Sequence, residues 1–273
     1  MEASERFREA QKAAWSAGDW PGFAPTIQGV ADAVVAALGV GAGDELLDVA
    51  TGSGNAALAA AARGARVTGL DFIPALVEAA RARAAAAGVE ATFVEGDAER
   101  LPFPDASFDC VTSIFGAMFA PGHRETAREL VRVARPGGTV AVTAWTPEGV
   151  NGQMFKVLGS HMPPPEGVEP PVLWGEESHV REIFDLPGVE VTCERRMAVI
   201  EHPSRDRWIE DLDTKLGPVV VAKSLLEPEG RWEAARADLE RLEDSHNQAT
   251  DGSYRAEAEY LLTTVRREAS GAL

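Results

Sequence analysis

Leu46–Asn55 reads LLDVATGSGN, an apolar run that is interrupted by one acid and followed by a glycine-rich turn. The run Leu46–Val49 is typical of a buried strand. Ala56–Ala62 comes next and favours a helix, because alanine has the highest helix propensity. Strand, glycine turn and helix together open a nucleotide-binding βαβ unit, in which the glycines let the backbone approach a ligand and the helix N-terminus offers free N–H groups.

Strand and helix signals alternate over residues 45–146. Pro74 suits a first helical position and Gly88 a helix end, so they bound one helix. Apolar residues on one face predict a second helix over His123–Arg135. Further strands are predicted at Arg66–Leu70, Ala91–Val94, Asp109–Phe115 and Thr139–Trp145. This alternation predicts an α/β fold with a mostly parallel sheet and helices on both of its faces.

The composition changes after Trp145. Val189–Cys193 and Arg196–Ile200 flank a short polar pair and predict two strands, antiparallel at the edge of the sheet, which brings the sheet to seven strands. The proline-rich stretch Pro163–Pro171 predicts an extended loop. Helices are predicted over Asn151–His161, from Ser204 onward, near Arg231–Asn247 and near Glu257–Arg267.

Two helices are also expected before the glycine turn, over residues 5–17 and Ile27–Leu38, separated by the turn-rich segment Gly18–Pro25. The proline-rich loop and the C-terminal helices have no evident task in holding the sheet, so we expect them to cover the carboxyl ends of the strands. We therefore divide the chain into five segments: an N-terminal helical lid at 1–44, an α/β core at 45–150, a proline-rich cap insertion at 151–186, edge strands at 187–203 and a helical cap at 204–273.

Composition narrows the possible partners. The 26 lysines and arginines stand against 43 acids, and a net charge of -17 would repel a phosphate backbone, so we expect no nucleic-acid substrate. The N-terminus lacks an apolar signal region and no apolar run approaches the length of a membrane span, so we expect a cytoplasmic protein without a membrane partner. Cys110 and Cys193 lie in strand-like runs and are expected to be free thiols.

Three acids each end one of the first three predicted strands. In an open α/β sheet, ligands bind outside the carboxyl ends of the strands, so Asp48, Asp71 and Asp97 are expected to face one crevice. Asp71 stands about 20 residues beyond the glycine turn, where a carboxylate accepts the hydroxyls of a ribose. Asp97 suits the amine of an adenine ring, and Asp48 suits a ligand ammonium. A purely structural role, as a helix cap or in a turn, is open for each acid.

Residues 45–146 resemble the class I S-adenosylmethionine-dependent methyltransferases. The resemblance is closest to the ubiquinone/menaquinone-biosynthesis-like group, called methyltransferase type 11, whose members are Rossmann-like. It rests on four motifs in this chain: DVATGSG (Asp48–Gly54), VTGLDF (Val67–Phe72), EGDAERLPFPDASFD (Glu95–Asp109) and LVRVARPGG (Leu130–Gly138). One departure is Ala50, where many members carry glycine, and we expect the methyl group to be tolerated.

The resemblance implies S-adenosylmethionine as the cofactor and S-adenosylhomocysteine as the product. It implies that Asp71 binds the ribose, that Phe72 stacks on the adenine and that Ala98 helps Asp97 to bind the ring edge. The implied cofactor-binding set is Trp15, Asp48, Ala50, Gly52, Gly54, Asn55, Asp71, Phe72, Gly96, Asp97, Ala98, Ser113, Ile114 and Phe115.

Methyl transfer is an in-line displacement at an already activated carbon, so it requires mainly positioning and removal of water. A base helps where the acceptor must first lose a proton. His123, His161 and His179 are the candidates for that base, with a solvated or helix-capping role as the alternative for each. The sequence contains no cluster of histidine, cysteine and carboxylate residues with the spacing typical of metal ligands, so we expect no metal ion.

An apolar, adaptable set of side chains is expected to bind the acceptor: Trp20, Met118, Phe119, Trp145, Met154 and Trp174. Trp15, Trp20 and Phe23 gather ahead of the glycine turn and either pack in the core or form a lid. A cap of this kind predicts a mid-sized hydrophobic or aromatic acceptor. We expect the acceptor to be methylated on O, N or C and to belong to secondary metabolism. We also expect the protein to be a monomer or a homodimer.

Two other functions are compatible with the sequence. The spacing Gly52-x-Gly54-x-x-Ala57 satisfies the dinucleotide pattern of an NAD(P)-dependent reductase, although Asp48 stands where a pyrophosphate needs a neutral approach. A protein that binds S-adenosylmethionine without transferring methyl, as a cyclase or a binding module, is also possible, because methyl transfer leaves no obligatory catalytic residue.

Overall fold

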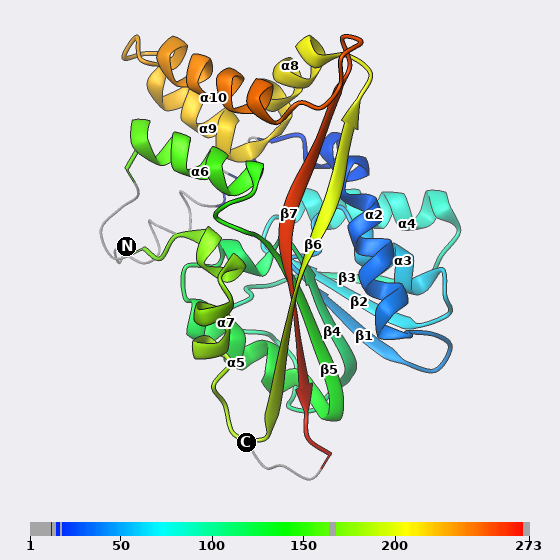
Figure 1. The fold of residues 1–273 in the computed structure, drawn as a ribbon. Coiled ribbons are helices and arrows are strands. Elements are labelled where there is room, and N and C mark those ends of the chain that lie inside the picture. The colour runs from blue at the N-terminus through cyan, green and yellow to red at the C-terminus, as the bar shows by residue number, and fades with distance from the viewer. Residues whose placement is uncertain (1–11, 13–14, 17, 164–167, 270–273) are drawn as a thin grey trace.

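The computed structural model describes residues 12, 15–16, 18–163 and 168–269 of the 273-residue chain. A seven-stranded sheet in the order β3-β2-β1-β4-β5-β7-β6 runs through its centre (Figure 1). The first five strands are parallel and β7 is antiparallel to both of its neighbours. The strands are β1 (Glu45–Val49), β2 (Arg66–Asp71), β3 (Thr92–Glu95), β4 (Phe108–Ile114), β5 (Ala134–Trp145), β6 (Val189–His202) and β7 (Tyr254–Arg267). The predicted α/β, Rossmann-like fold with an antiparallel edge is confirmed.

Helices cover both faces of the parallel part of the sheet (Figure 1). One face packs against α2 (Trp20–Leu38), α3 (Asn55–Ala61) and α4 (Pro74–Ala87), and the other against α5 (His123–Val133). In β1, Leu46 through Val49 are all buried, without the alternation of a half-exposed strand. This continuous burial follows from its position between β2 and β4, with helices above and below.

The prediction of a helix near Glu257–Arg267 is wrong, because this segment is strand β7. Its residues Tyr260, Thr263 and Val265 belong to the aromatic and β-branched types that favour strands. The strand lies between β5 and β6 and forms hydrogen-bonded ladders with both. Pairing on two sides therefore outweighs the helical spacing of its apolar residues.

The two strands predicted at Val189–Cys193 and Arg196–Ile200 are one continuous strand, β6. Glu194 and Arg195, expected to separate them, pair with Leu262 and Leu261 of β7. No glycine, proline, asparagine or aspartate stands there to form a tight turn, so the chain continues straight. The antiparallel edge of the sheet is thus the pair β6–β7.

Four helices gather beyond the carboxyl ends of the parallel strands (Figure 1). They are α6 (Val150–His161), α8 (Arg205–Lys215), α9 (Gly217–Leu226) and α10 (Trp232–His246), of which α9 was not predicted. Glu243 of α10 accepts hydrogen bonds from Trp208 Nε1 of α8, at 2.9 Å, and from the hydroxyl of Tyr254 of β7. This buried contact fixes the cap to the end of the sheet, and burial raises the pKa of Glu243.

Helix α2 begins at Trp20, earlier than predicted, and includes most of the turn-rich segment 18–25. Asp19 caps it by accepting a 3.0 Å hydrogen bond from the Gly22 amide, and Pro21 occupies the first turn, where its missing N–H costs nothing. Of the helix predicted over residues 5–17, all but Lys12, Trp15 and Ser16 lie outside the described residues.

Both cysteines are free thiols, as predicted. Within the described ranges, no helix has the length and apolar character needed to cross a bilayer. Two shorter elements complete the fold between β5 and β6, the 3-10 helix η2 (Pro171–Gly175) and helix α7 (Glu177–Ile183).

Candidate functional site

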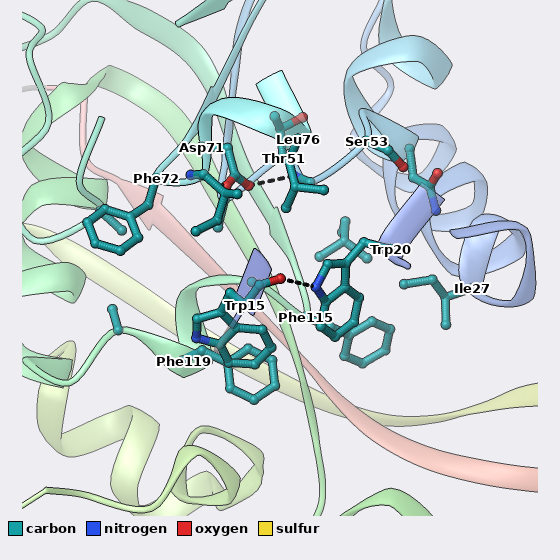
Figure 2. Close-up of a pocket in the computed structure, with 18 of the residues that line it drawn as sticks. Trp15, Trp20, Ile27, Thr51, Ser53, Asp71, Phe72, Leu76, Phe115 and Phe119 are labelled. Carbon is teal, nitrogen blue, oxygen red and sulfur yellow. Dashed lines mark hydrogen bonds between the residues drawn. The ribbon is translucent and has the colours of Figure 1, made fainter. Parts of the chain in front are cut away.

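A pocket opens at the carboxyl ends of the parallel strands, and residues of α6 and α9 in the cap also line it. The ends of β1 and β2 and the segments that follow β1, β2 and β3 form one part of it, and they carry Asp48, Asp71 and Asp97. The three acids that end successive predicted strands therefore line one pocket. Figure 2 shows the opposite part, where the rings of Trp15, Trp20, Phe115 and Phe119 gather.

The glycine turn after β1 has a left-handed backbone. Gly52 has φ 57° and Gly54 has φ 93°, a region that glycine enters without strain. Ala50 also has a positive φ, 52°, at a cost of about 1 kcal/mol for a residue with a Cβ. Its methyl group lies against Gly116, where an added Cβ would come within 2.6 Å of it. The alanine is thus accommodated by a glycine on the facing segment.

Asp48 holds this turn in place from below. One carboxylate oxygen accepts hydrogen bonds from Thr51 Oγ1 at 2.6 Å and from the Ala57 amide at 3.2 Å. The other oxygen accepts from Thr112 Oγ1 at 2.8 Å. Burial raises the pKa of Asp48 to about 6, although these hydrogen bonds act in the opposite direction. Asp48 therefore has a structural role, and its contact with a ligand ammonium stays a prediction.

Asp71 links the end of β2 to the glycine turn. Its Oδ2 accepts a 2.7 Å hydrogen bond from the Gly52 amide and its Oδ1 accepts one of 2.9 Å from the Ile73 amide. The carboxyl group is buried, which raises its pKa. A carboxylate has about four lone-pair sites, so these hydrogen bonds leave some acceptor capacity for a ligand hydroxyl. Phe72, the next residue, lines the same pocket (Figure 2).

Most of the predicted cofactor-binding residues line the pocket, and three do not. Gly54 is the N-cap of α3 and lies against Leu58 and Phe93. The Gly96 amide donates to the Asp71 carbonyl at 3.0 Å, outside the pocket lining. Ser113 Oγ, which is buried, donates to the Val49 carbonyl at 2.7 Å. The members that line the pocket are Trp15, Asp48, Ala50, Gly52, Asn55, Asp71, Phe72, Asp97, Ala98, Ile114 and Phe115.

The predicted acceptor-binding residues divide in a similar way. Trp20, Phe119, Trp145 and Met154 line the pocket, whereas Met118 and Trp174 are buried in the core behind it. The sequence did not predict several further lining residues. For those near the start of α9, the proline in its first turn is a signal of a helix start that could have located them. The missed residues include Ile27, Leu76, Asn151, Leu216 and Pro218.

Aromatic rings from distant segments meet at the pocket. Trp15 lies 4.3 Å from Phe119 and 5.4 Å from Trp20, measured between ring centroids. Trp20 Nε1 donates a 2.7 Å hydrogen bond to the Trp15 carbonyl, the dashed line between them in Figure 2. Phe115 stacks on Trp145 at 3.7 Å. Trp15 and Trp20 thus form part of the pocket wall.

None of the three candidate bases lines the pocket. His161 Nε2 lies 2.7 Å from Asp238 Oδ2, in a pair between α6 and α10. His123 is buried, with its Nδ1 2.9 Å from His179 Nε2. Burial and the neighbouring His179 lower the pKa of His123 to about 4. The titratable side chains in the described pocket lining are Asp48, Asp71, Asp97 and Glu99.

Comparison with known proteins indicates a methyltransferase domain and a shared fold. A family model described as a methyltransferase domain matches residues 47–142. An uncharacterized protein of Mycobacterium tuberculosis is 36% identical over 94% of this chain and 93% of its own length. A demethylmenaquinone methyltransferase of Thermus thermophilus is 42% identical over 41% of this chain and 53% of its own length. The crystal structure of the YcgJ protein from Bacillus subtilis shares the fold, with a TM-score of 0.62 at 22% identity, over 87% of this chain and 97% of that one.

Proposed function

We propose that this chain, which carries a methyltransferase domain over residues 47–142, binds S-adenosylmethionine in this pocket and methylates a small hydrophobic or aromatic acceptor. The observation that carries the proposal is the charge of the lining. Four carboxylates line the pocket, and no lysine, arginine or histidine occurs among the described lining residues. A negative surround suits a ligand with a sulfonium and an ammonium.

The same observation argues against a dinucleotide. A pyrophosphate needs cations or free backbone N–H groups, and the glycine turn is where a dinucleotide fold supplies them. Here the Gly52 amide donates to Asp71, and Asp48 lies directly beneath the turn. The two charges of a pyrophosphate would therefore meet carboxylates in place of donors.

The strand ends are suited to hold an adenosyl group. Asp71 would accept ribose hydroxyls through its remaining acceptor capacity. Lys12 Nζ lies 4.6 Å from the centroid of the Phe72 ring, and the adenine would stack on the other face of that ring. Asp97 accepts a 3.0 Å hydrogen bond from the Glu99 amide, which orients its carboxylate beside Ala98 at the rim. The cofactor, once bound, supplies an activated methyl carbon. The task of the chain is then to orient the acceptor and to exclude water.

The other half of the pocket indicates the class of acceptor. Phe119, Met154, Phe155, Leu216 and Pro218 form an apolar wall, which suits a planar or hydrophobic molecule. None of the histidines contributes a base, so we propose an acceptor that is nucleophilic without one, such as an amine, an electron-rich ring carbon or a phenol that ionises in water.

Asn151 is the polar group in this apolar half. It lines the pocket from the first turn of α6, and its Nδ2 is buried without a hydrogen-bond partner among the described residues. A buried donor left unpaired costs about 1–3 kcal/mol. We propose that an oxygen of the acceptor is the partner of this carboxamide, which would orient the ring toward the cofactor.

Two assays test the proposal together. Calorimetric titration should show one site for S-adenosylhomocysteine and no binding of NADH. Incubation with S-adenosylmethionine labelled in the methyl group, and with a panel of phenols, amines and hydrophobic acids, should then transfer label to at least one of them. Binding of NADH in place of S-adenosylhomocysteine would favour a reductase. Binding of S-adenosylhomocysteine without transfer to any acceptor would favour a cyclase or a binding protein.

A further inference from the structure

A cluster of three metal-ligating side chains lies outside the pocket. His123 begins α5 in the core, His179 belongs to α7, and Glu169 precedes η2. Glu169 follows His123 by 46 residues and precedes His179 by 10, so the three residues do not form a short ligand motif in the sequence. Neither the proposed cofactor nor the proposed acceptor would contact it, since none of the three residues lines the pocket.

The ligand atoms of the cluster converge on one point. His123 Nδ1 lies 2.9 Å from His179 Nε2 and 3.5 Å from Glu169 Oε2, and the three atoms lie within 4.8 Å of one another. Ligands held at 2.0–2.2 Å around a tetrahedral zinc ion are about 3.4 Å apart. The two measured separations lie on either side of that value, so small side-chain rotations would create a three-ligand site.

A hydrogen bond between the two imidazoles explains only part of this arrangement. One shared proton satisfies the 2.9 Å contact, but it leaves the Glu169 carboxylate facing the same nitrogen with no proton to accept. The ring of His123 is buried, and its Nε2 has no hydrogen-bond partner among the described residues, so its polar contacts are made through Nδ1. A cation between the three groups would accept one lone pair from each of them.

We propose that His123, Glu169 and His179 bind one divalent transition-metal ion, with zinc as the occupant. Two imidazoles and one carboxylate favour zinc over magnesium or calcium, which prefer oxygen ligands alone. Glu169 is 47% exposed, so water has access to a fourth coordination position.

The role of such a site would be to join the cap insertion to the core. His123 stands two residues after Pro121, which lines the pocket, while Glu169 and His179 flank η2 in the segment between α6 and β6. A bound ion would therefore fix the segment around η2 against the start of α5. This role is independent of the proposed methyl transfer.

The test is direct titration with the metal alone. Full-length protein is dialysed against a chelator, freed of it, and titrated with zinc chloride by calorimetry, and cobalt(II) is added to a second sample. We expect one zinc ion per chain and a visible absorption band typical of cobalt with four ligands. We also expect a higher melting temperature in zinc, because a ligand that binds only the folded state stabilises it.

Variants separate this site from adventitious binding. Loss of an outer-shell partner lowers metal affinity by about 10–100-fold, so loss of a ligand itself should lower zinc affinity by at least about 100-fold in His179→Ala and at least about 10-fold in Glu169→Gln. Both side chains are at least partly exposed, so the variants should fold, which circular dichroism checks. His161→Ala is the matched control, because His161 also pairs with a carboxylate, Asp238, in the cap.

Two results would overturn the proposal. One is wild-type protein that binds no stoichiometric zinc at micromolar concentrations. The other is a His179→Ala variant that folds and binds zinc as tightly as the wild type. Neither result bears on the cofactor pocket, whose own test is the titration with S-adenosylhomocysteine.

Discussion

The two halves of the pocket are assembled in different ways. The polar half consists of the ends of β1 and β2 and the short segments that follow β1, β2 and β3, and it holds all four lining carboxylates. The apolar half takes its side chains from places far apart in the chain: α2, the segment after β4, α6 and the start of α9. One half depends on strand ends that lie side by side, and the other depends on how distant helices pack.

This difference explains what the fold can and cannot determine. The positions of Asp48 and Asp71 follow from parallel strands and the glycine turn, so any chain with this fold can place acids there. The apolar wall requires only side chains of suitable size, and these change without disturbing the sheet. We therefore expect cofactor binding and acceptor choice to respond to separate substitutions.

The largest effect is expected in the polar half. Asp71→Asn should weaken binding of S-adenosylhomocysteine by at least about 100-fold, because it removes a charged acceptor and turns an amide toward the Gly52 N–H. Asp238→Asn, in the cap, is the matched control and should bind normally. Calorimetric titration measures the affinity of both variants. Wild-type affinity in Asp71→Asn would contradict a contact between Asp71 and the ribose.

A smaller effect is expected in the apolar half. Phe119→Ala should raise the KM for an acceptor found in the transfer assay by about 10-fold or more, because it removes a large apolar surface from the wall. Binding of S-adenosylhomocysteine should change less than about 3-fold. Phe103→Ala is the control, since Phe103 packs on Phe108 away from the pocket. Equal losses of cofactor and acceptor binding would show that the two halves are not separable.

The pH dependence should also come from the polar half. Burial raises the pKa of Asp48 to about 6, and the ammonium group of the ligand favours its ionised form, so affinity for S-adenosylhomocysteine should fall as the pH drops through 6. The expected decrease between pH 7 and pH 5 is about tenfold. Asp71, whose pKa is also raised by burial, adds to this decrease. Titrations in one buffer series measure it, and a constant affinity over this range would exclude a role for Asp48 ionisation.

The smallest effect is expected at Ala50. Ala50→Gly relieves a left-handed φ worth about 1 kcal/mol, but the added freedom of the unfolded chain offsets about 0.5–1 kcal/mol of it. The melting temperature and cofactor affinity should therefore stay close to wild type. A large gain in affinity would mean that the alanine methyl obstructs the ligand, contrary to the close fit against Gly116.

The same difference between the halves limits what the sequence predicts. The strand ends and their acids were predictable because Asp48, Asp71 and the glycine turn lie within one continuous pattern of strand and helix. Strand β7 was mistaken for a helix, because its partners β5 and β6 are distant in sequence and apolar spacing alone cannot reveal pairing on both sides.

The histidines show this limit most clearly. His123 and His179 resembled catalytic bases beside the pocket, yet the fold turns them toward each other and toward Glu169. The sequence separation of these residues hides the cluster, and the packing of α7 beside α5 creates it. Asn151 was missed for a similar reason, because nothing local distinguishes it from an exposed polar residue at the start of a helix.

The most direct test of the account is a crystal structure of the protein with S-adenosylhomocysteine. We predict that both ribose hydroxyls lie within hydrogen-bond distance of Asp71, that the adenine lies between Phe72 and the Asp97–Ala98 segment, and that the amino-acid end lies over Gly52. A ligand bound elsewhere, or with its ribose turned away from Asp71, would contradict the claim that the strand-end carboxylates form the cofactor site.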